Sequence, residues 1–99
     1  LHYYTNSAHI EMVNNVVRNG SLIEFESKAV SDGTLRARVF SANGSLVRSI
    51  PGESVPANAI VRKSWDGLND AGEQVANGLY FLKIENASID QWYEAIVQW

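Results

Sequence analysis

The stretch SWDGLNDAGEQVANGLYFLKI, residues 64–84, has the most distinctive pattern in the sequence. An aromatic residue precedes a run rich in acidic residues and glycine, and an alternating apolar segment follows it. The run contains two turn dipeptides, Asp66-Gly67 and Asn77-Gly78. Asp and Asn side chains accept hydrogen bonds from nearby backbone N–H groups, and glycine adopts positive φ without steric cost. We therefore predict a structural loop that joins two β-strands.

Calcium binding is the functional alternative for the same run. The oxygen-bearing side chains that could form a cage are Asp66, Asn69, Asp70 and Glu73. An EF-hand loop requires a glycine at its sixth position and a glutamate at its twelfth. Counted from Asp66, these positions hold Ala71 and Asn77, so the run is not an EF-hand. A cage of another kind is the remaining alternative to a purely structural turn.

Alternating apolar and polar residues on both sides of this loop predict half-buried strands. The alternation is clear in residues 21–28, 34–41 and 79–85, and an Asn-Gly pair at 43–44 is typical of a hairpin turn. Both prolines fall in residues 51–58, where we expect a loop because proline lacks the N–H that a central strand donates. About seven short strands with regular turns predict an all-β, two-sheet antiparallel β-sandwich of the immunoglobulin or fibronectin type III kind.

The predicted strands at 21–28 and 34–41 present charged residues on their outward faces. If these strands formed a direct hairpin, Glu24 would face Arg38 and Glu26 would face Arg36. In a fibronectin-like topology the two strands belong to opposite sheets, and the pairs would not form. In both cases we expect the glutamates on a solvated face, because glycosidase chemistry by paired carboxylates also requires a cleft and a raised pKa.

The composition restricts the class of function. The chain has 99 residues, which suits one domain, with 45% apolar and 19% charged residues. A net charge of −3 argues against a nucleic-acid partner, which requires a basic face. No apolar run is long enough to predict membrane insertion, and the absence of cysteine excludes disulfides and thiolate metal sites. With no catalytic or phosphate-binding motif, we expect neither enzymatic activity nor a cofactor.

The chain begins at Leu1 without a leader pattern, so we expect a fragment of a longer protein. We interpret residues 1–18 as a linker or an edge strand of the sandwich. Residues 19–99 then form the immunoglobulin-like domain.

The spacing of residues around the loop resembles the immunoglobulin-like domain of bacterial flagellar hook-capping proteins. It is also similar to C-terminal modules of secreted bacterial proteins, including type IX secretion sorting domains. The resemblance covers residues 21–98 and rests on the structural signature Trp65, Asp66, Gly67, Asn69, Asp70, Gly72, Gly78 and Tyr80, with Val39, Phe40, Gly44, Val47, Val75 and Ile84. It implies a structural loop without a catalytic role.

Aromatic residues raise a separate question about binding. The alternation places Trp65 and Tyr80 in the core, and it places Phe81 and Trp92 on the outer face of neighbouring strands. Tyr3 and Tyr4 could join them. An exposed aromatic patch can contact a protein or a sugar ring. The alternative is that the N-terminal segment or a neighbouring domain covers it.

We therefore expect a non-catalytic accessory or C-terminal module of a bacterial extracytoplasmic protein, secreted or at the cell surface. It would act in spacing, docking or attachment, with a neighbouring domain or another subunit as partner. The alternatives are an assembly module like that of a flagellar hook cap, and a carbohydrate-binding module that takes a polysaccharide on its exposed aromatics.

Overall fold

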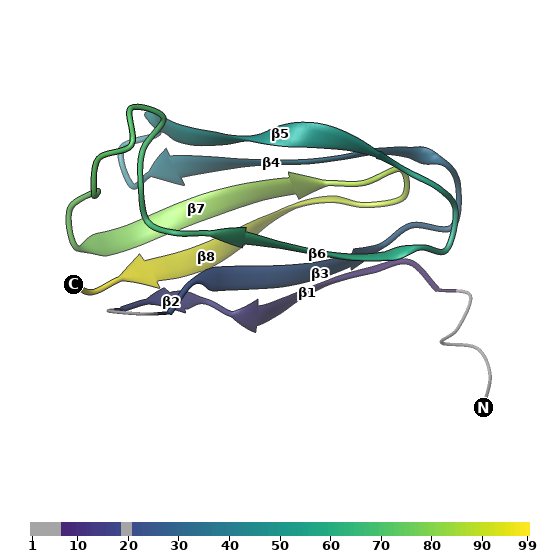
Figure 1. Cartoon of the computed structure of the whole chain (residues 1–99), viewed down its shortest axis with the longest axis horizontal. Coiled ribbons are helices and arrows are strands. Elements are labelled where there is room, and N and C mark those ends of the chain that lie inside the picture. Colours follow the sequence, from purple (N-terminus) through teal and green to yellow (C-terminus); the bar gives the residue numbers. More distant parts are fainter. Residues whose placement is uncertain (1–6, 19–20) are drawn as a thin grey trace.

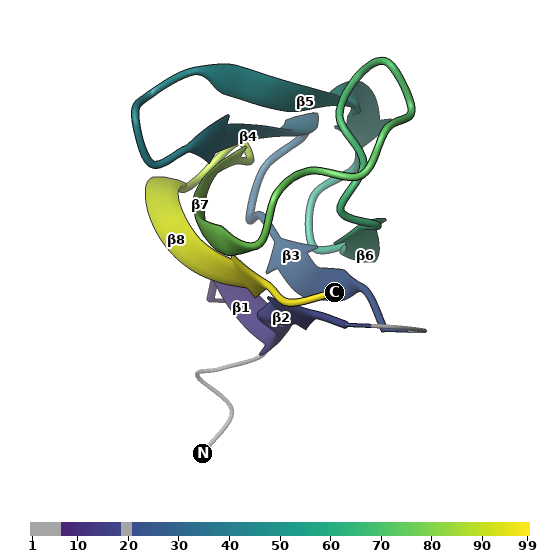
Figure 2. The same ribbon diagram turned by 90° about the vertical axis from the view of Figure 1, so that its left-hand side faces the viewer.

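The computed structural model describes residues 7–18 and 21–99, which form two packed β-sheets (Figure 1). The smaller sheet has three antiparallel strands in the order β1-β3-β6. Its strands are β1 (His9–Asn14), β3 (Ile23–Lys28) and β6 (Ile60–Trp65). The end view shows this sheet facing the larger one across the core (Figure 2).

The larger sheet has five strands in the order β2-β8-β7-β4-β5. Its strands are β2 (Val16–Val17), β4 (Gly33–Ser41), β5 (Leu46–Val55), β7 (Gly78–Glu85) and β8 (Asp90–Val97). Every pairing is antiparallel except β2 with β8, which is parallel. The expected all-β immunoglobulin-like sandwich is confirmed. Among the described residues, no helix is long and apolar enough to cross a membrane.

The N-terminal part of the chain contributes a strand to each sheet. β1 pairs with β3, and after a kink at Asn14-Asn15 the chain continues as β2 along β8. The Asn14 amide holds this kink by donating to the carbonyls of Val16 and Leu22. Two asparagines can stabilise such a break because their side chains substitute for backbone partners.

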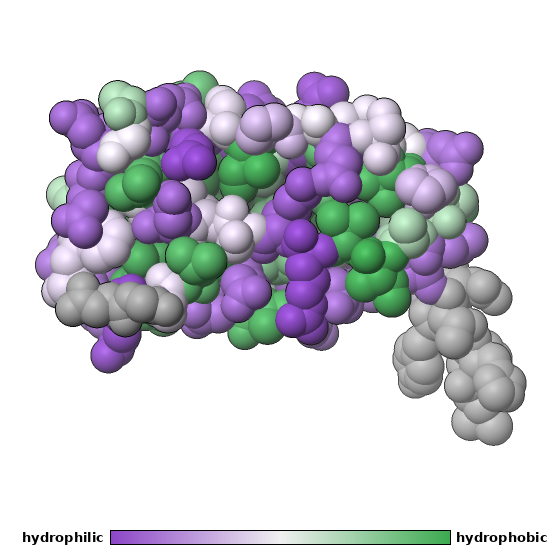
Figure 3. Space-filling model, in the orientation of Figure 1, coloured by the Kyte–Doolittle hydropathy of each residue, from purple (hydrophilic) through white to green (hydrophobic). Residues whose placement is uncertain are grey.

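The core lies between the two sheets and follows the alternation of the strands. Apolar residues from both sheets are buried there, because each strand directs every second side chain inward. The buried cluster consists of Val17, Ile23, Phe25, Leu35, Ala37, Val39, Trp65, Tyr80, Leu82, Ile84, Ala95 and Val97. On the surface shown in Figure 3, hydrophobic residues are interspersed with hydrophilic ones.

The loop expected for residues 51–58 is partly wrong, because β5 continues through Pro51 to Val55. β5 lies at the edge of its sheet and β4 is its single neighbouring strand, so a residue without an N–H is tolerated there. The register with β4 also shifts between Leu35 and Ala37, close to the proline. A bulge on an edge strand removes the need for one ladder hydrogen bond.

The direct pairs of Glu24 with Arg38 and Glu26 with Arg36 do not form, because β3 and β4 belong to different sheets. Glu26 instead contacts its neighbours on β1 and β6. His9 Nε2 donates to Glu26 Oε2 at 2.9 Å, and Arg62 Nε lies 3.4 Å from Oε1. The hydrogen bond from His9 holds the pKa of Glu26 below its usual value.

Candidate functional site

The acidic run at 66–77 folds as a loop whose oxygens bind the chain itself. Asp66 Oδ1 accepts from the N–H of Leu68 at 3.0 Å, and Asn69 Oδ1 accepts from the N–H groups of Ala71 and Glu73 at 3.0 Å each. The Gly72 N–H donates to the Asn69 carbonyl, which closes the tight turn. These are the contacts expected of a structural turn rather than of an open cage.

The loop also docks on the edge strand β5. Asp70 Oδ1 accepts from the Ser49 N–H at 3.0 Å, and the Asp70 N–H donates to the Val47 carbonyl at 3.0 Å. Arg48 Nη1 donates to the Leu68 carbonyl at 3.1 Å and lies 3.4 Å from Asp66 Oδ1. The loop therefore links the end of β6 in one sheet to β5 in the other.

Two of the four candidate calcium ligands, Asp66 and Asp70, lie beside a cation that the chain already supplies. The Arg48 guanidinium lies 3.4 Å from Asp66 and 3.9 Å from Asp70. A guanidinium at this position competes electrostatically with a metal ion. Within residues 7–18 and 21–99, no group of three or more His, Cys, Asp or Glu side chains is arranged to hold a metal ion.

Trp65 and Gly67 of the structural signature have packing roles. Trp65 is buried, its ring meets Tyr80 edge-on with 5.6 Å between centroids, and its Nε1 donates to the Leu68 carbonyl at 2.8 Å. Gly67 has φ of +80°, and a Cβ there would lie 2.6 Å from the Trp99 ring. Sequence reasoning did not predict the Trp99 contact, because strand order decides which side chain covers the loop.

Tyr80 completes the signature at the start of β7. Its hydroxyl donates to the Ala76 carbonyl at 2.7 Å, which fixes the last part of the loop against the strand. Burial raises the pKa of this phenol, so the hydroxyl stays protonated as a donor at neutral pH.

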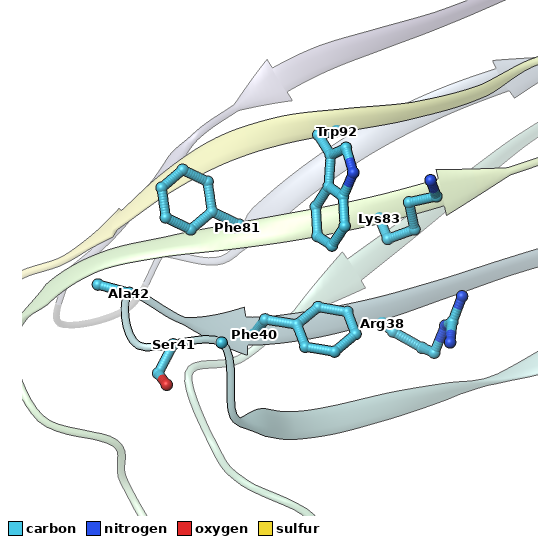
Figure 4. Close-up of a pocket in the computed structure, with 8 residues that line it drawn as sticks. Arg38, Phe40, Ser41, Ala42, Phe81, Lys83 and Trp92 are labelled. Carbon is cyan, nitrogen blue, oxygen red and sulfur yellow. The ribbon is translucent and has the colours of Figure 1, made fainter.

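The outer face of the five-stranded sheet presents the expected aromatic pair and a third ring. Phe81 lies on β7 and Trp92 on β8, where 55% of the tryptophan is exposed. Phe40, from β4, pairs in register with Phe81 and meets Trp92 edge-on with 5.3 Å between centroids. The rings of Phe40 and Trp92 point toward one another across β7 (Figure 4). Tyr3 and Tyr4 lie outside the described residues.

These rings line a shallow hollow of about 530 Å³ in this face. Its lining is Arg38, Phe40, Ser41, Ala42, Gly44, Phe81, Lys83 and Trp92. Both charged residues of the lining are basic. Lys83 Nζ lies 5.0 Å from the centroid of the Trp92 ring, and the Arg38 guanidinium lies 5.8 Å from that of Phe40. We call Phe40, Phe81, Trp92, Arg38 and Lys83 the aromatic–basic patch.

Aliphatic side chains extend this patch along the same face. Leu46 of β5 pairs with Phe40, and Leu79 of β7 pairs with Ile96 of β8. These three aliphatic residues are among the exposed large hydrophobic residues of the chain. A surface that groups aromatic and aliphatic side chains over neighbouring strands is typical of an interaction site.

The two-sheet fold and the docked loop define an immunoglobulin-like domain. A family model for the FlgD Ig-like domain matches residues 14–90, so the chain belongs to this family. This family indicates a structural or protein-contact module.

Among solved structures, the dimeric latent form of PorU from Porphyromonas gingivalis contains a similar region. The TM-score is 0.64 and the sequence identity is 20%, over 91% of this chain and 9% of PorU. This chain therefore spans less than a tenth of PorU, and the similarity shows the fold alone. A comparison with curated proteins found no match.

Proposed function

We propose that this chain is a non-catalytic accessory module of a bacterial extracytoplasmic protein, and that it docks on a polypeptide partner through its aromatic–basic patch. The observation that supports this proposal most directly is Trp92, which is 55% exposed beside two other rings on one sheet face. Tryptophan and arginine are enriched at the energetic centres of protein interfaces. The extracytoplasmic setting is proposed from the resemblance to hook-capping proteins and secreted modules, which the family match supports.

A protein partner fits the patch better than a polysaccharide. Sugar rings stack on flat aromatic surfaces, but the planes of Phe40 and Trp92 meet at 61°, so they form no common platform. The Lys83 ammonium also lies over the Trp92 ring, at 5.0 Å from its centroid. A sugar stacked on that side of the ring would have to displace a favourable cation–π contact.

Photo-crosslinking in the cells that produce the protein tests this function. A photoreactive phenylalanine analogue replaces Phe81 in the patch, and a matched control places it at Arg62, which is exposed on the other sheet. We expect the Phe81 position to crosslink to a polypeptide, identified by mass spectrometry, and the Arg62 position to do so much less. Equal crosslinking at both positions would contradict docking through the patch.

The same experiment separates the two kinds of protein partner. Crosslinks to another segment of the same polypeptide would identify an accessory module docked on its neighbour. Crosslinks between copies of this domain would identify the assembly module that the hook-cap resemblance suggests.

A further inference from the structure

The charges around the aromatic–basic patch are unevenly distributed. Arg38 and Lys83 are in register on β4 and β7, and both line the hollow. Their acidic partners, Glu85 and Asp90, face each other at the far ends of β7 and β8 and do not line it. The hollow therefore has an aromatic floor with positive charge along one side.

The basic side chains are held at this side but are free to exchange their partners. Arg38 Nη2 lies 3.1 Å from Glu85 Oε1, and Lys83 Nζ lies 2.8 Å from Asp90 Oδ1. Each pair has one exposed and one half-buried member: Arg38 is 44% and Asp90 57% exposed, whereas Glu85 is 30% and Lys83 21% exposed. Surface ion pairs of this kind contribute little to stability, so a carboxylate from a partner can share or replace them at small cost.

The side of the patch away from Arg38 and Lys83 favours apolar groups of a partner over acidic ones. Glu94 on β8 is paired in register with Phe81, and the aliphatic residues Leu79 and Ile96 follow beyond it. An acidic group of a partner is disfavoured near Glu94, whereas an apolar group is accepted by the neighbouring side chains. The outer face of the larger sheet therefore favours the acidic end of a bound segment at Arg38 and Lys83 and its apolar end beside Leu79 and Ile96.

We propose that the hollow binds an extended acidic polypeptide segment, with an apolar side chain against Phe40, Phe81 and Trp92 and carboxylates paired with Arg38 and Lys83. This inference rests on the proposed docking function and names the chemistry of the partner. Charge complementarity of this kind sets specificity and the rate of association more than affinity. An acidic partner also explains why both basic residues of the hollow lie on one side.

Peptide pools titrated into the ¹⁵N-labelled chain test the inference. All pools contain blocked heptapeptides with Leu, Phe or Val at alternate positions, and the other positions are acidic, basic or neutral. The signals to follow are the indole N–H of Trp92 and the amides of Phe40 and Phe81. We expect the acidic pool to shift these signals at the lowest concentration.

Charge variants give the decisive comparison. Arg38→Gln with Lys83→Gln should weaken the response to the acidic pool about fivefold. Arg38→Glu with Lys83→Glu should reverse the preference, so that the basic pool binds better. Arg62→Gln, on the opposite sheet, is the matched control and should change neither preference.

The outcomes separate the partner chemistry from the docking function. If all pools bind equally and Trp92→Ala abolishes binding, docking stands and the acidic partner is refuted. The inference is also refuted if no pool shifts the patch signals or if a soluble glucan shifts them at lower concentration than the acidic pool. Shifts that depend on protein concentration without peptide would show a second copy of the chain in the hollow instead.

Discussion

Truncation of Trp65 tests the core of the sandwich and the docked loop together. Trp65 is 2% exposed, it packs edge-on against Tyr80, and its indole N–H donates to the Leu68 carbonyl. Trp65→Ala removes the ring, leaves a cavity between the sheets and deletes this hydrogen bond. We expect the free energy of unfolding to fall by about 3–5 kcal/mol, as for other large core truncations.

This loss is large compared with the stability of a small domain, which is about 5–15 kcal/mol. Trp65→Phe therefore provides a milder companion variant. The Leu68 carbonyl still accepts from Arg48 Nη1 at 3.1 Å, so the loss of the indole donor leaves no unpaired carbonyl. We expect Trp65→Phe to lose about 1–2 kcal/mol, mainly through poorer packing.

Urea unfolding followed by far-ultraviolet circular dichroism measures both variants, because tryptophan fluorescence changes with the substitution itself. The slope of the unfolding free energy against urea concentration should stay constant for both variants. A loss below about 1 kcal/mol for Trp65→Ala would refute the assignment of this ring to the core.

Three further predictions concern the loop and the smaller sheet. Gly67→Ala should lose more stability than Gly72→Ala in urea unfolding. Both glycines have positive φ, where a substitution to alanine costs about 1 kcal/mol of stability, but only at Gly67 would the added Cβ also meet the Trp99 ring. Equal losses would contradict the Trp99 contact. The pKa of Glu26 is lowered by its hydrogen bond from His9, so its stabilisation is complete above pH 4.5 and is lost as the pH falls through the folded pKa. The difference in urea midpoint between the wild type and Glu26→Gln should therefore shrink below pH 4.5, and a constant difference would argue against this pair. The melting temperature should be equal in calcium and in chelator, and a rise in calcium would restore the metal-binding alternative.

The alternation of the sequence predicted which side chains are buried, because a strand that covers a core must present every second residue to it. Leu35, Ala37 and Val39 are all buried as this rule requires. The loop expected around Pro51 was partly wrong for another reason: it assumed that proline cannot lie in a strand, and the sequence does not reveal that β5 is an edge strand. The ion pairs of Glu26 could not be predicted from the sequence either, because they depend on which strands become neighbours.

The same limit applies to the candidate site. Alternation predicted that Phe81 and Trp92 lie outward on neighbouring strands, and the structure shows both on the outer face of β7 and β8. It could not predict that Phe40 and Arg38 join them, because that requires β4 to lie beside β7. The two outward aromatic residues were enough to predict a binding face from the sequence. The role of Arg38 and Lys83 became clear only when the structure paired them across β4 and β7.

The parallel pairing of β2 with β8 has a mechanical consequence. The Ile96 N–H donates to the Asn15 carbonyl and the Gln98 N–H to the Val17 carbonyl, each at 2.9 Å. When tension pulls the two ends of a chain apart, parallel neighbours slide along each other, so these bonds bear the load together instead of opening one by one. A module that separates or tethers other domains would thus resist stretching at the junction of β2 with β8, its last strand.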